Sequence, residues 1–348
     1  MALAVLAAGL VAMFLAIRDI RFARGRFALM TTVVALVTVL LVLLSSLTRG
    51  LGAQNTSALD SLPGQSVLLS PTGDQISWDD SVIEPATVTR LTGAQPVRPL
   101  VVTRARMELD GRTGSVVVLG SDANHPAGTV ALGRSTAEDL GAEVGSTLEL
   151  NGTRLRVAAV DDDLSWSHQA VAWTSVADAN AIGHLPAGQA TALLVDGDVE
   201  LTGSGLVELS RTDAIAALPG YSSEHGSLVT IQGFLYGVSG LVVLAFLSVW
   251  TVQRTRDIAV LRALGATRRY VLGDSLGQAA LLLAAGVALG SLFGTGLALL
   301  AARAVPVLVA PGTTVVPALG VLAVGLLGSV LATRRVTTVD PLLALGGN

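Results

Sequence analysis

The chain of 348 residues contains no cysteine, and its basic residues are all arginine. Without cysteine it cannot form disulfides, thiolate metal sites or cysteine nucleophiles. Without lysine it cannot build the phosphate-binding loop Gly-x-x-x-x-Gly-Lys-[Ser/Thr], whose lysine reaches the nucleotide phosphates. Neither Gly-x-Ser-x-Gly nor His-Glu-x-x-His occurs in the sequence. We therefore expect no catalytic residues, no cofactor of its own and no ATP hydrolysis by this chain.

Charged residues are also scarce. They make up 14% of the chain, against roughly 25% in an average soluble domain. Hydrophobic residues make up 51%, and the mean hydropathy is +0.65. This composition is typical of a membrane protein. The net charge of -4, with few aromatic residues beside the scattered arginines, gives no indication of nucleic-acid binding.

Four segments are apolar over a length that can cross a hydrocarbon core of about 30 Å, which takes roughly 20 helical residues. We expect transmembrane helices at 27–50, 228–252, 272–302 and 315–333. The segment 51–227 holds most of the acidic residues and turn formers, which predicts a compact, water-exposed domain. The predicted fold class is a membrane protein with four transmembrane α-helices and one large mixed α+β extracytoplasmic domain between the first and second spans.

Arginine clusters orient the spans. They lie before the first span, between the second and third, and after the fourth: Arg18, Arg21, Arg24 and Arg26; Arg254, Arg256, Arg262, Arg268 and Arg269; Arg334 and Arg335. By the positive-inside rule all three clusters are cytoplasmic. We therefore expect a multi-pass protein of the bacterial plasma membrane. Its two termini, the loop 253–271 and the tail 334–348 lie inside, and the domain 51–227 and the loop 303–314 lie outside.

The N-terminal segment 1–26 is apolar and then basic. Phe14, Ile17, Ile20 and Phe22 alternate with arginines. This pattern favours an amphipathic helix in the inner headgroup layer. A fifth hydrophobic element, or a biological start at Met13, would also account for residues 1–12.

The clearest folding signals of the segment 51–227 lie between residues 129 and 160. Residues 129–133 read as a strand, and Ser135 is expected to cap a short helix that ends at Gly141. Two alternating strands follow, joined by Asn151-Gly152, which predicts a type I′ hairpin. Further strands are expected at 65–70, 97–108, 114–120 and 192–195, whereas residues 71–94 carry no clear signal.

Acidic residues and histidines are candidate metal ligands. Asp161, Asp162 and Asp163, followed by His168, are ligand types that bind divalent cations. Their spacing differs from that of a calcium loop, so a solvated loop is favoured and no metal site is predicted. The other histidines, His125, His184 and His225, are isolated beside turn formers or polar residues, which favours surface positions.

Polar side chains are rare within the predicted spans. Gln232, Tyr236 and Ser239 follow helical spacing and share one face of the second span. A polar face at that depth must meet protein, water or substrate. Hydrogen bonding between helices is the simpler interpretation, and substrate contact is the alternative. Met30, on the first span, is a further candidate for substrate contact.

Glycines recur every four residues in two spans. Gly286, Gly290 and Gly294 do so in the third, and Gly233 and Gly237 in the second. Small residues at this spacing let two helices approach closely. The partner is either another helix of this chain or, for the second span, a second copy of it.

The loop between the second and third spans carries the most specific pattern of the chain. It reads Arg-Thr-Arg-Asp-Ile-Ala-Val-Leu-Arg-Ala-Leu-Gly-Ala from Arg254 to Ala266. This resembles the signature Arg-x-x-Glu-Ile-Gly-x-Leu-Arg-Ala-Leu-Gly-Ala of the MacB/FtsX family of ABC-transporter permeases. Asp257 stands for the family's glutamate and Ala259 for its glycine. The unit from 129 to 160 is also similar to the extracytoplasmic core domain of that family.

The resemblance implies a permease subunit of a mechanotransmission exporter, which works as a homodimer in membrane lipid. ATP and Mg are then bound by a partner ATPase. The ATPase would dock on the cytoplasmic loop, through Arg254, Arg256, Asp257, Ile258, Leu261, Arg262 and Gly265.

Within the family, the layout most resembles the short DevC and HrtB types. HrtB relatives export haem, so haem is the expected substrate. Two alternatives remain open: signalling to a cell-wall hydrolase, as in FtsX, and extrusion of lipoproteins or peptides.

Overall fold

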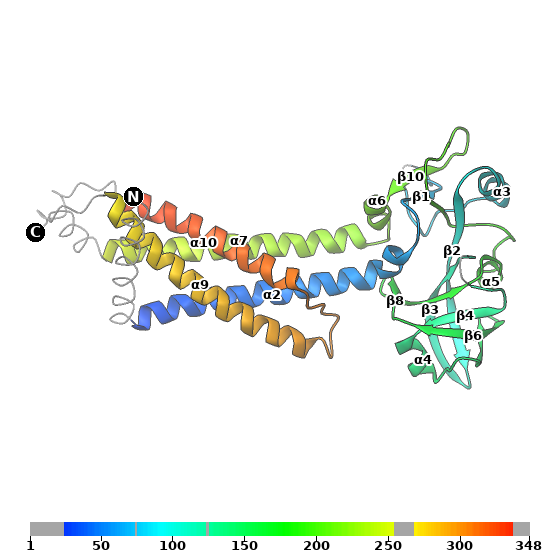
Figure 1. Cartoon of the computed structure of the whole chain (residues 1–348), viewed down its shortest axis with the longest axis horizontal. Helices are drawn as coiled ribbons and strands as arrows, with labels where there is room; N and C mark the ends of the chain where they lie inside the picture. The colour runs from blue at the N-terminus through cyan, green and yellow to red at the C-terminus, as the bar shows by residue number, and fades with distance from the viewer. Residues whose placement is uncertain (1–23, 74, 123–124, 254–267, 337–348) are drawn as a thin grey trace, which may run out of the picture. The chain divides into compact units, whose positions relative to one another are not determined.

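The computed structural model describes residues 24–73, 75–122, 125–253 and 268–336 (Figure 1). These residues form two compact units. The membrane unit comprises the described residues up to Gly50 and from Ser227 onward, and the sheet unit comprises those from Leu51 to Gly226.

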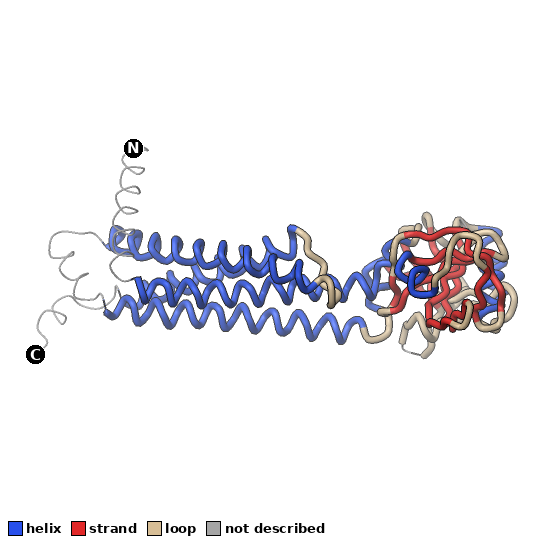
Figure 2. Tube along the Cα trace, turned by 90° about the horizontal axis from the view of Figure 1, so that it is seen from below, coloured by secondary structure: helices blue, strands red, loops and turns tan. Residues whose placement is uncertain are grey.

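The membrane unit is built from long apolar helices that run side by side (Figures 1 and 2). Among the described residues, four helices are long and apolar enough to cross a membrane: α2 (Arg24–Ser61), α7 (Tyr221–Gln253), α9 (Arg268–Ala301) and α10 (Pro311–Val336). All four contribute to one core, which includes Phe27, Met30, Val34, Leu41, Val243, Leu283, Val287 and Val321.

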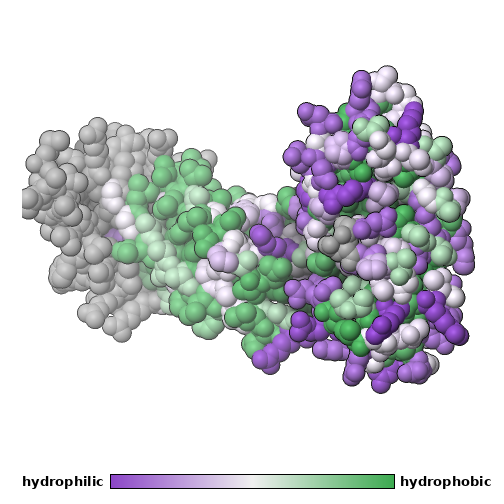
Figure 3. All heavy atoms as spheres, turned by 45° about the vertical axis from the view of Figure 1, so that its right-hand side comes forward, coloured by the Kyte–Doolittle hydropathy of each residue, from purple (hydrophilic) through white to green (hydrophobic). Residues whose placement is uncertain are grey.

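The outside of these helices is apolar as well, as the hydrophobic surface in Figure 3 shows. Phe234, Leu292 and Leu327 are 72%, 69% and 64% exposed. Helices that are apolar on every side are stable in lipid, where their backbone groups are satisfied internally. The chain is therefore a membrane protein, and its four apolar helices with a sheet-rich domain between the first and second confirm the predicted fold class.

Helix ends differ from the bounds read from hydropathy. α2 continues past residue 50 to Ser61, α7 begins at Tyr221 and not at 228, and α10 begins at Pro311 and not at 315. Hydropathy marks the part of a helix that lipid accepts, but a helix continues wherever neighbouring structure supports it. Residues 51–61 therefore belong to the sheet unit while still being helical.

The sheet unit contains one curled, mixed sheet. Its described strands pair in the order β10-β1-β9-β2-β3-β8-β4-β6-β5, β7 pairs with β8, and β5 also pairs with β2, which bends the sheet back on itself. The pairs β3–β8 and β4–β6 are parallel. The strands are β1 (Ser66–Leu69), β2 (Val97–Leu109), β3 (Arg112–Gly120), β4 (Thr129–Gly133), β5 (Thr147–Leu150), β6 (Thr153–Asp161), β7 (Ser165–Trp166), β8 (Gln169–Thr174), β9 (Ala192–Val195) and β10 (Val207–Ser210).

In the described part of this unit, four short helices accompany the sheet: α3 (Pro85–Ala94), α4 (Arg134–Leu140), α5 (Val176–Ile182) and α6 (Arg211–Ala216). The largest apolar cluster joins α4 and α5 to β2, β3 and β6. A second cluster is centred on Trp78 and Trp166, whose rings meet edge to face with centroids 4.8 Å apart.

The hairpin and the helix end predicted around residue 150 are confirmed. Asn151 and Gly152 have φ of 45° and 86°, as a type I′ turn requires, and they join β5 and β6. Gly141 ends α4 in the left-handed conformation with φ of 68°. The four further strand predictions correspond to β1, β2, β3 and β9.

The prediction that Ser135 caps α4 is wrong. The helix starts at Arg134, and Gly133 occupies the N-cap position without a side-chain hydrogen bond. The backbone N–H and the hydroxyl of Ser135 both donate to Oδ1 of Asp163, at 2.9 and 2.8 Å. A carboxylate from after β6 thus takes the capping role, because the parallel pairing of β4 and β6 brings Asp163 to the helix start.

Candidate functional site

The polar face of α7 points into the membrane unit. Gln232 Nε2 donates to Oγ1 of Thr48 on α2 at 3.1 Å. Tyr236 lies against Gly320 of α10, where an added Cβ would come within 2.6 Å of its ring. Ser239 is 2% exposed. Gln232 therefore makes the hydrogen bond between helices that its position favoured, and a substrate role for these side chains stays a prediction.

Met30 and Phe234 lie in opposite environments. Met30 is 3% exposed and belongs to the core shared by the helices, so within one chain its sulfur is shielded from ligands. Phe234 points away from that core.

The glycines of α9 face α2. An added Cβ would lie 2.8 Å from Val34 at Gly286, 2.5 Å from the carbonyl oxygen of Ala35 at Gly290, and 3.0 Å from Val42 at Gly294. No side chain fits in these positions, so the two backbones approach closely. This stripe serves packing within the chain.

The glycines of α7 face no part of the chain that the structure describes. A Cβ added at Gly233 or Gly237 would meet no atom within 4 Å. Their neighbours Phe234, Val238 and Leu241 are all more than half exposed.

An apolar groove opens on the membrane unit beside the polar face of α7. It has a volume of about 410 Å³. Its lining comes from α2, α7 and the end of α9 with the segment that follows: Leu40, Leu43, Leu44, Leu47, Leu235, Ala301, Val305 and Val307. Such a groove can accept an acyl chain or the edge of a flat apolar ring.

Asn55 and Glu224, which the sequence did not single out, hold the ends of α2 and α7 inside the sheet unit together with His168. Asn55 on α2 donates through Nδ2 to Oε2 of Glu224 on α7 at 3.2 Å. His168 Nε2 lies 3.1 Å from the same carboxylate oxygen and 3.1 Å from Asn55 Nδ2. The backbone N–H groups of Ser167 and His168 donate to the carbonyls of Asn55 and Gln54. Both helices are thereby joined to the turn between β7 and β8.

Arg211 fastens the end of α2 a second time. Its guanidinium donates to the carbonyls of Leu59, Asp60 and Gly64 at 3.2, 3.1 and 2.8 Å, and also to that of Leu62. A cation at a helix C-terminus satisfies carbonyls that lack partners within the helix. Arg211 begins α6, which leads into α7, so one side chain links the two long helices.

The acidic run and His168 do not converge. Asp163 caps α4, Asp162 is 3.8 Å from Arg134 at the surface, and His168 bonds to Glu224. Among the described residues, no three His, Asp or Glu side chains are grouped to hold a metal ion. His184 is exposed, His225 stacks on Tyr221, and His125 is half-buried against Trp173, deeper than predicted.

The predicted ATPase-coupling residues lie outside the described residues. They are Arg254, Arg256, Asp257, Ile258, Leu261, Arg262 and Gly265. The same holds for the N-terminal segment 1–23 and the residues after 336.

This chain is similar to known membrane permeases. Residues 229–341 match the family described as FtsX-like permease C-terminal. A Staphylococcus epidermidis protein named as a hemin transport system permease protein, HrtB, is 20% identical over 96% of this chain and 99% of its own length. An uncharacterized ABC transporter permease of Mycobacterium tuberculosis is 24% identical over the same shares.

One solved structure is also similar. It is the extracellular domain of the ABC-type transporter YknZ from Gram-positive bacteria, which is 9% identical and covers 40% of this chain and 87% of that chain. Its TM-score of 0.29 is too low to establish a shared fold.

The chain is thus an ABC-transporter permease of the MacB/FtsX type, because the FtsX-like domain spans α7 to α10 and relatives align along nearly its whole length. Within that type it is a permease of the HrtB kind. The first statement confirms the resemblance seen in the cytoplasmic loop, and the second confirms the resemblance of the layout to the short HrtB type.

Proposed function

We propose that this permease moves a hydrophobic or amphiphilic substrate out of the cell or its membrane, that the substrate is haem, and that a separate ATPase subunit supplies the energy. One observation carries the proposal: two relatives named for hemin transport align with 96% of the chain. The apolar groove is in keeping with it, because a flat amphiphile needs apolar walls and a few polar groups at the rim.

The polar face of α7 lies near this groove along the helix, although its side chains are not part of the lining. Leu235 lines the groove, and Gln232 and Tyr236 flank Leu235 along the helix. A phenol oxygen is a known type of haem iron ligand. We assign Tyr236 as the substrate ligand, with Gln232 and Ser239 beside it.

Transport by mechanotransmission requires long helices that move as rigid bodies with the sheet unit. The contacts of Asn55, His168 and Glu224 support this role, because they join α2 and α7 to one turn of the sheet unit. The exposed glycines on α7 support assembly of two copies, since small residues at that spacing allow close helix packing.

Haem transport is tested with the permease and its ATPase produced together in a haem-sensitive bacterium. We expect greater haem tolerance and, for the purified complex in lipid nanodiscs, faster ATP hydrolysis when haem is added. A complex that hydrolyses ATP but responds to haem in neither assay would rule out haem as substrate. Signalling to a hydrolase, or extrusion of lipoproteins, would then be tested next.

The substrate ligand is tested by Tyr236→Phe, which keeps the ring against Gly320 and removes only the hydroxyl. We expect weaker haem binding and a shifted Soret band, with a smaller effect of Gln232→Ala. Phe234→Leu, on the outward face, is the matched control. An unaltered spectrum and affinity in Tyr236→Phe would eliminate Tyr236 as the ligand.

Docking of the ATPase is tested in the cytoplasmic loop. Reversing Arg256 and Arg262 to Glu should release the ATPase or uncouple ATP hydrolysis from transport, while the chain still inserts into the membrane. Normal copurification and coupled turnover in that double variant would refute docking at this loop.

Orientation can be read by labelling, since the native chain has no cysteine. A single cysteine at Ser135 or Ser222 should react with a membrane-impermeant maleimide in intact cells, and one at Thr255 should not. Labelling at Thr255 would overturn the proposed orientation.

A further inference from the structure

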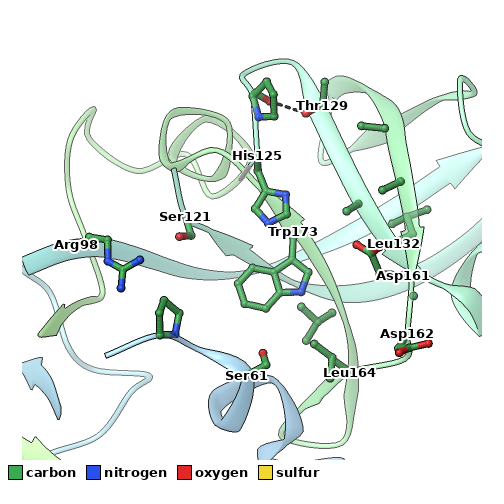
Figure 4. A pocket seen from close by; sticks show the side chains of 17 residues that line it. Ser61, Arg98, Ser121, His125, Thr129, Leu132, Asp161, Asp162, Leu164 and Trp173 are labelled. Atoms are coloured by element: carbon green, nitrogen blue, oxygen red, sulfur yellow. Dashed lines mark hydrogen bonds between the residues drawn. The ribbon is translucent and has the colours of Figure 1, made fainter. Parts of the chain in front are cut away.

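The sheet unit contains a cleft of about 770 Å³ (Figure 4). It is lined by residues of β4, β6 and β8 together with the last residue of α2, Ser61. One wall is apolar and includes Leu132, Leu164 and Val171. The cleft is large enough for a flat ligand of drug size.

A stacked pair of rings stands in this cleft. The imidazole of His125 lies on the indole of Trp173, with ring centroids 5.7 Å apart and planes inclined by 18°. Within the described part of the chain, the imidazole makes no hydrogen bond or ion pair. Burial lowers the pKa of His125, and nearby Asp161 offsets only part of that effect. The ring is therefore neutral at pH 7 and keeps a nitrogen lone pair for a ligand.

The charged side chains of the cleft lie on two sides of the ring pair. Figure 4 shows Arg98 on one side and Asp161 with Asp162 on the other. Arg98 Nη2 pairs with Asp196 at 2.8 Å, while its Nε is buried without a partner among the described residues. The cleft thus offers a cation at one end, aromatic surface in the middle and carboxylates at the other end.

We propose that this cleft is a second haem site, separate from the groove of the membrane unit. A ring nitrogen of His125 binds the iron, Trp173 holds the imidazole in place, and Arg98 pairs with a propionate. The carboxylates of Asp161 and Asp162 repel propionates and so direct them toward Arg98. The neutral imidazole suits the iron, the apolar wall suits the porphyrin ring, and the guanidinium suits a propionate. Together they match haem better than they match a ligand without a metal.

This inference rests on haem as the substrate under the proposed function, and it is tested on the full-length permease in nanodiscs. Ferric haem is titrated into the Tyr236→Phe variant, which lacks the proposed ligand in the membrane unit. Adding His125→Asn should weaken the remaining binding by about tenfold or more, the loss expected when a ligand bond is removed. His184→Asn, at an exposed histidine of the same unit, is the matched control and should change nothing.

Two further variants separate ligation from folding. His125→Tyr keeps a ring against Trp173 and offers an oxygen, so it should retain haem with a shifted Soret band. Arg98→Gln should weaken both haem and metal-free protoporphyrin, whereas His125→Asn should leave metal-free protoporphyrin unaffected. A Soret band unchanged by both His125→Asn and His125→Tyr would overturn this site and leave haem transport standing. A wild-type chain that binds no haem at all would overturn both.

Discussion

Two glycine stripes with the same four-residue spacing have opposite surroundings in this membrane unit. Gly286, Gly290 and Gly294 on α9 are pressed against α2, whereas Gly233 and Gly237 on α7 face open space. The spacing alone shows that another helix can pack closely against the glycines. It does not show whether that helix belongs to the same chain or to a second copy.

The surfaces opposite each stripe explain the difference. α2 places Val34, Ala35, Thr38 and Val42 against the glycines of α9, and the Thr38 hydroxyl bonds back to the carbonyl of Val34 at 2.8 Å. The stripe on α7 lies instead among outward-facing large apolar side chains. The glycine stripe of α9 is therefore covered by α2 of the same chain. Under the proposed function, the glycine stripe of α7 remains free to contact a second copy.

The largest effect is expected for Gly290→Leu. Its Cβ would meet the carbonyl of Ala35 and the side chain of Thr38, both at 2.5 Å, so α2 and α9 must separate. Overpacking of this kind costs about 3 kcal/mol. Unfolding in mixed detergent micelles measures the loss. Gly296→Leu on the same helix, where a Cβ meets nothing within 4 Å, is the control. Equal stability of the two variants would show that the glycine stripe of α9 is not closely packed against α2, and the contrast with α7 would be lost.

An intermediate effect is expected for Gly237→Leu, and only on assembly. The added side chain meets no part of the described chain, so the stability of a single copy should stay within about 0.5 kcal/mol. The dimer should dissociate at higher concentrations than the wild type, as measured by mass photometry in nanodiscs. Gly237→Cys should also crosslink two copies, whereas Gly286→Cys should not. Crosslinking at Gly286 alone would reverse the assignment of the stripes.

The smallest effect is expected for Gln232→Leu, which removes the hydrogen bond from α7 to Thr48 on α2. Hydrogen bonds between membrane helices contribute about 0.6 kcal/mol on average. A double-mutant cycle with Thr48→Val measures the coupling directly. A coupling energy near zero would show that packing alone holds the inward face of α7.

Short local patterns encode several turns and helix starts of the sheet unit. Asn151-Gly152 predicted its turn, because both residues tolerate positive φ. Ser175 and Ser210 cap α5 and α6 by accepting from the backbone N–H groups of Asp178 and Asp213. A serine at the N-cap with an aspartate three residues later marks a helix start, so both starts were predictable from the sequence. The start of α3 was predictable as well, because Pro85 occupies its first turn.

The candidate sites were predictable only where their residues lie on one helix. Gln232, Tyr236 and Ser239 share a face of α7 because helical spacing dictates it. The contacts of Asn55 with His168 and Glu224 join residues 113 and 169 positions apart. The pairing of His125 with Trp173 likewise depends on how β8 lies in the sheet. No local pattern encodes such contacts.

The sequence by itself determined the membrane class, the four apolar helices and the permease type, because the hydropathy and the loop motif that reveal them are properties of short stretches of chain. Only the tertiary structure decided that Asp163 and not Ser135 caps α4, that the helices at Ser61 and Tyr221 extend into the sheet unit, and which glycine stripe is filled. Each of these outcomes depends on which distant surfaces meet. That choice is made by packing and long-range pairing, and spacing along the chain leaves it open.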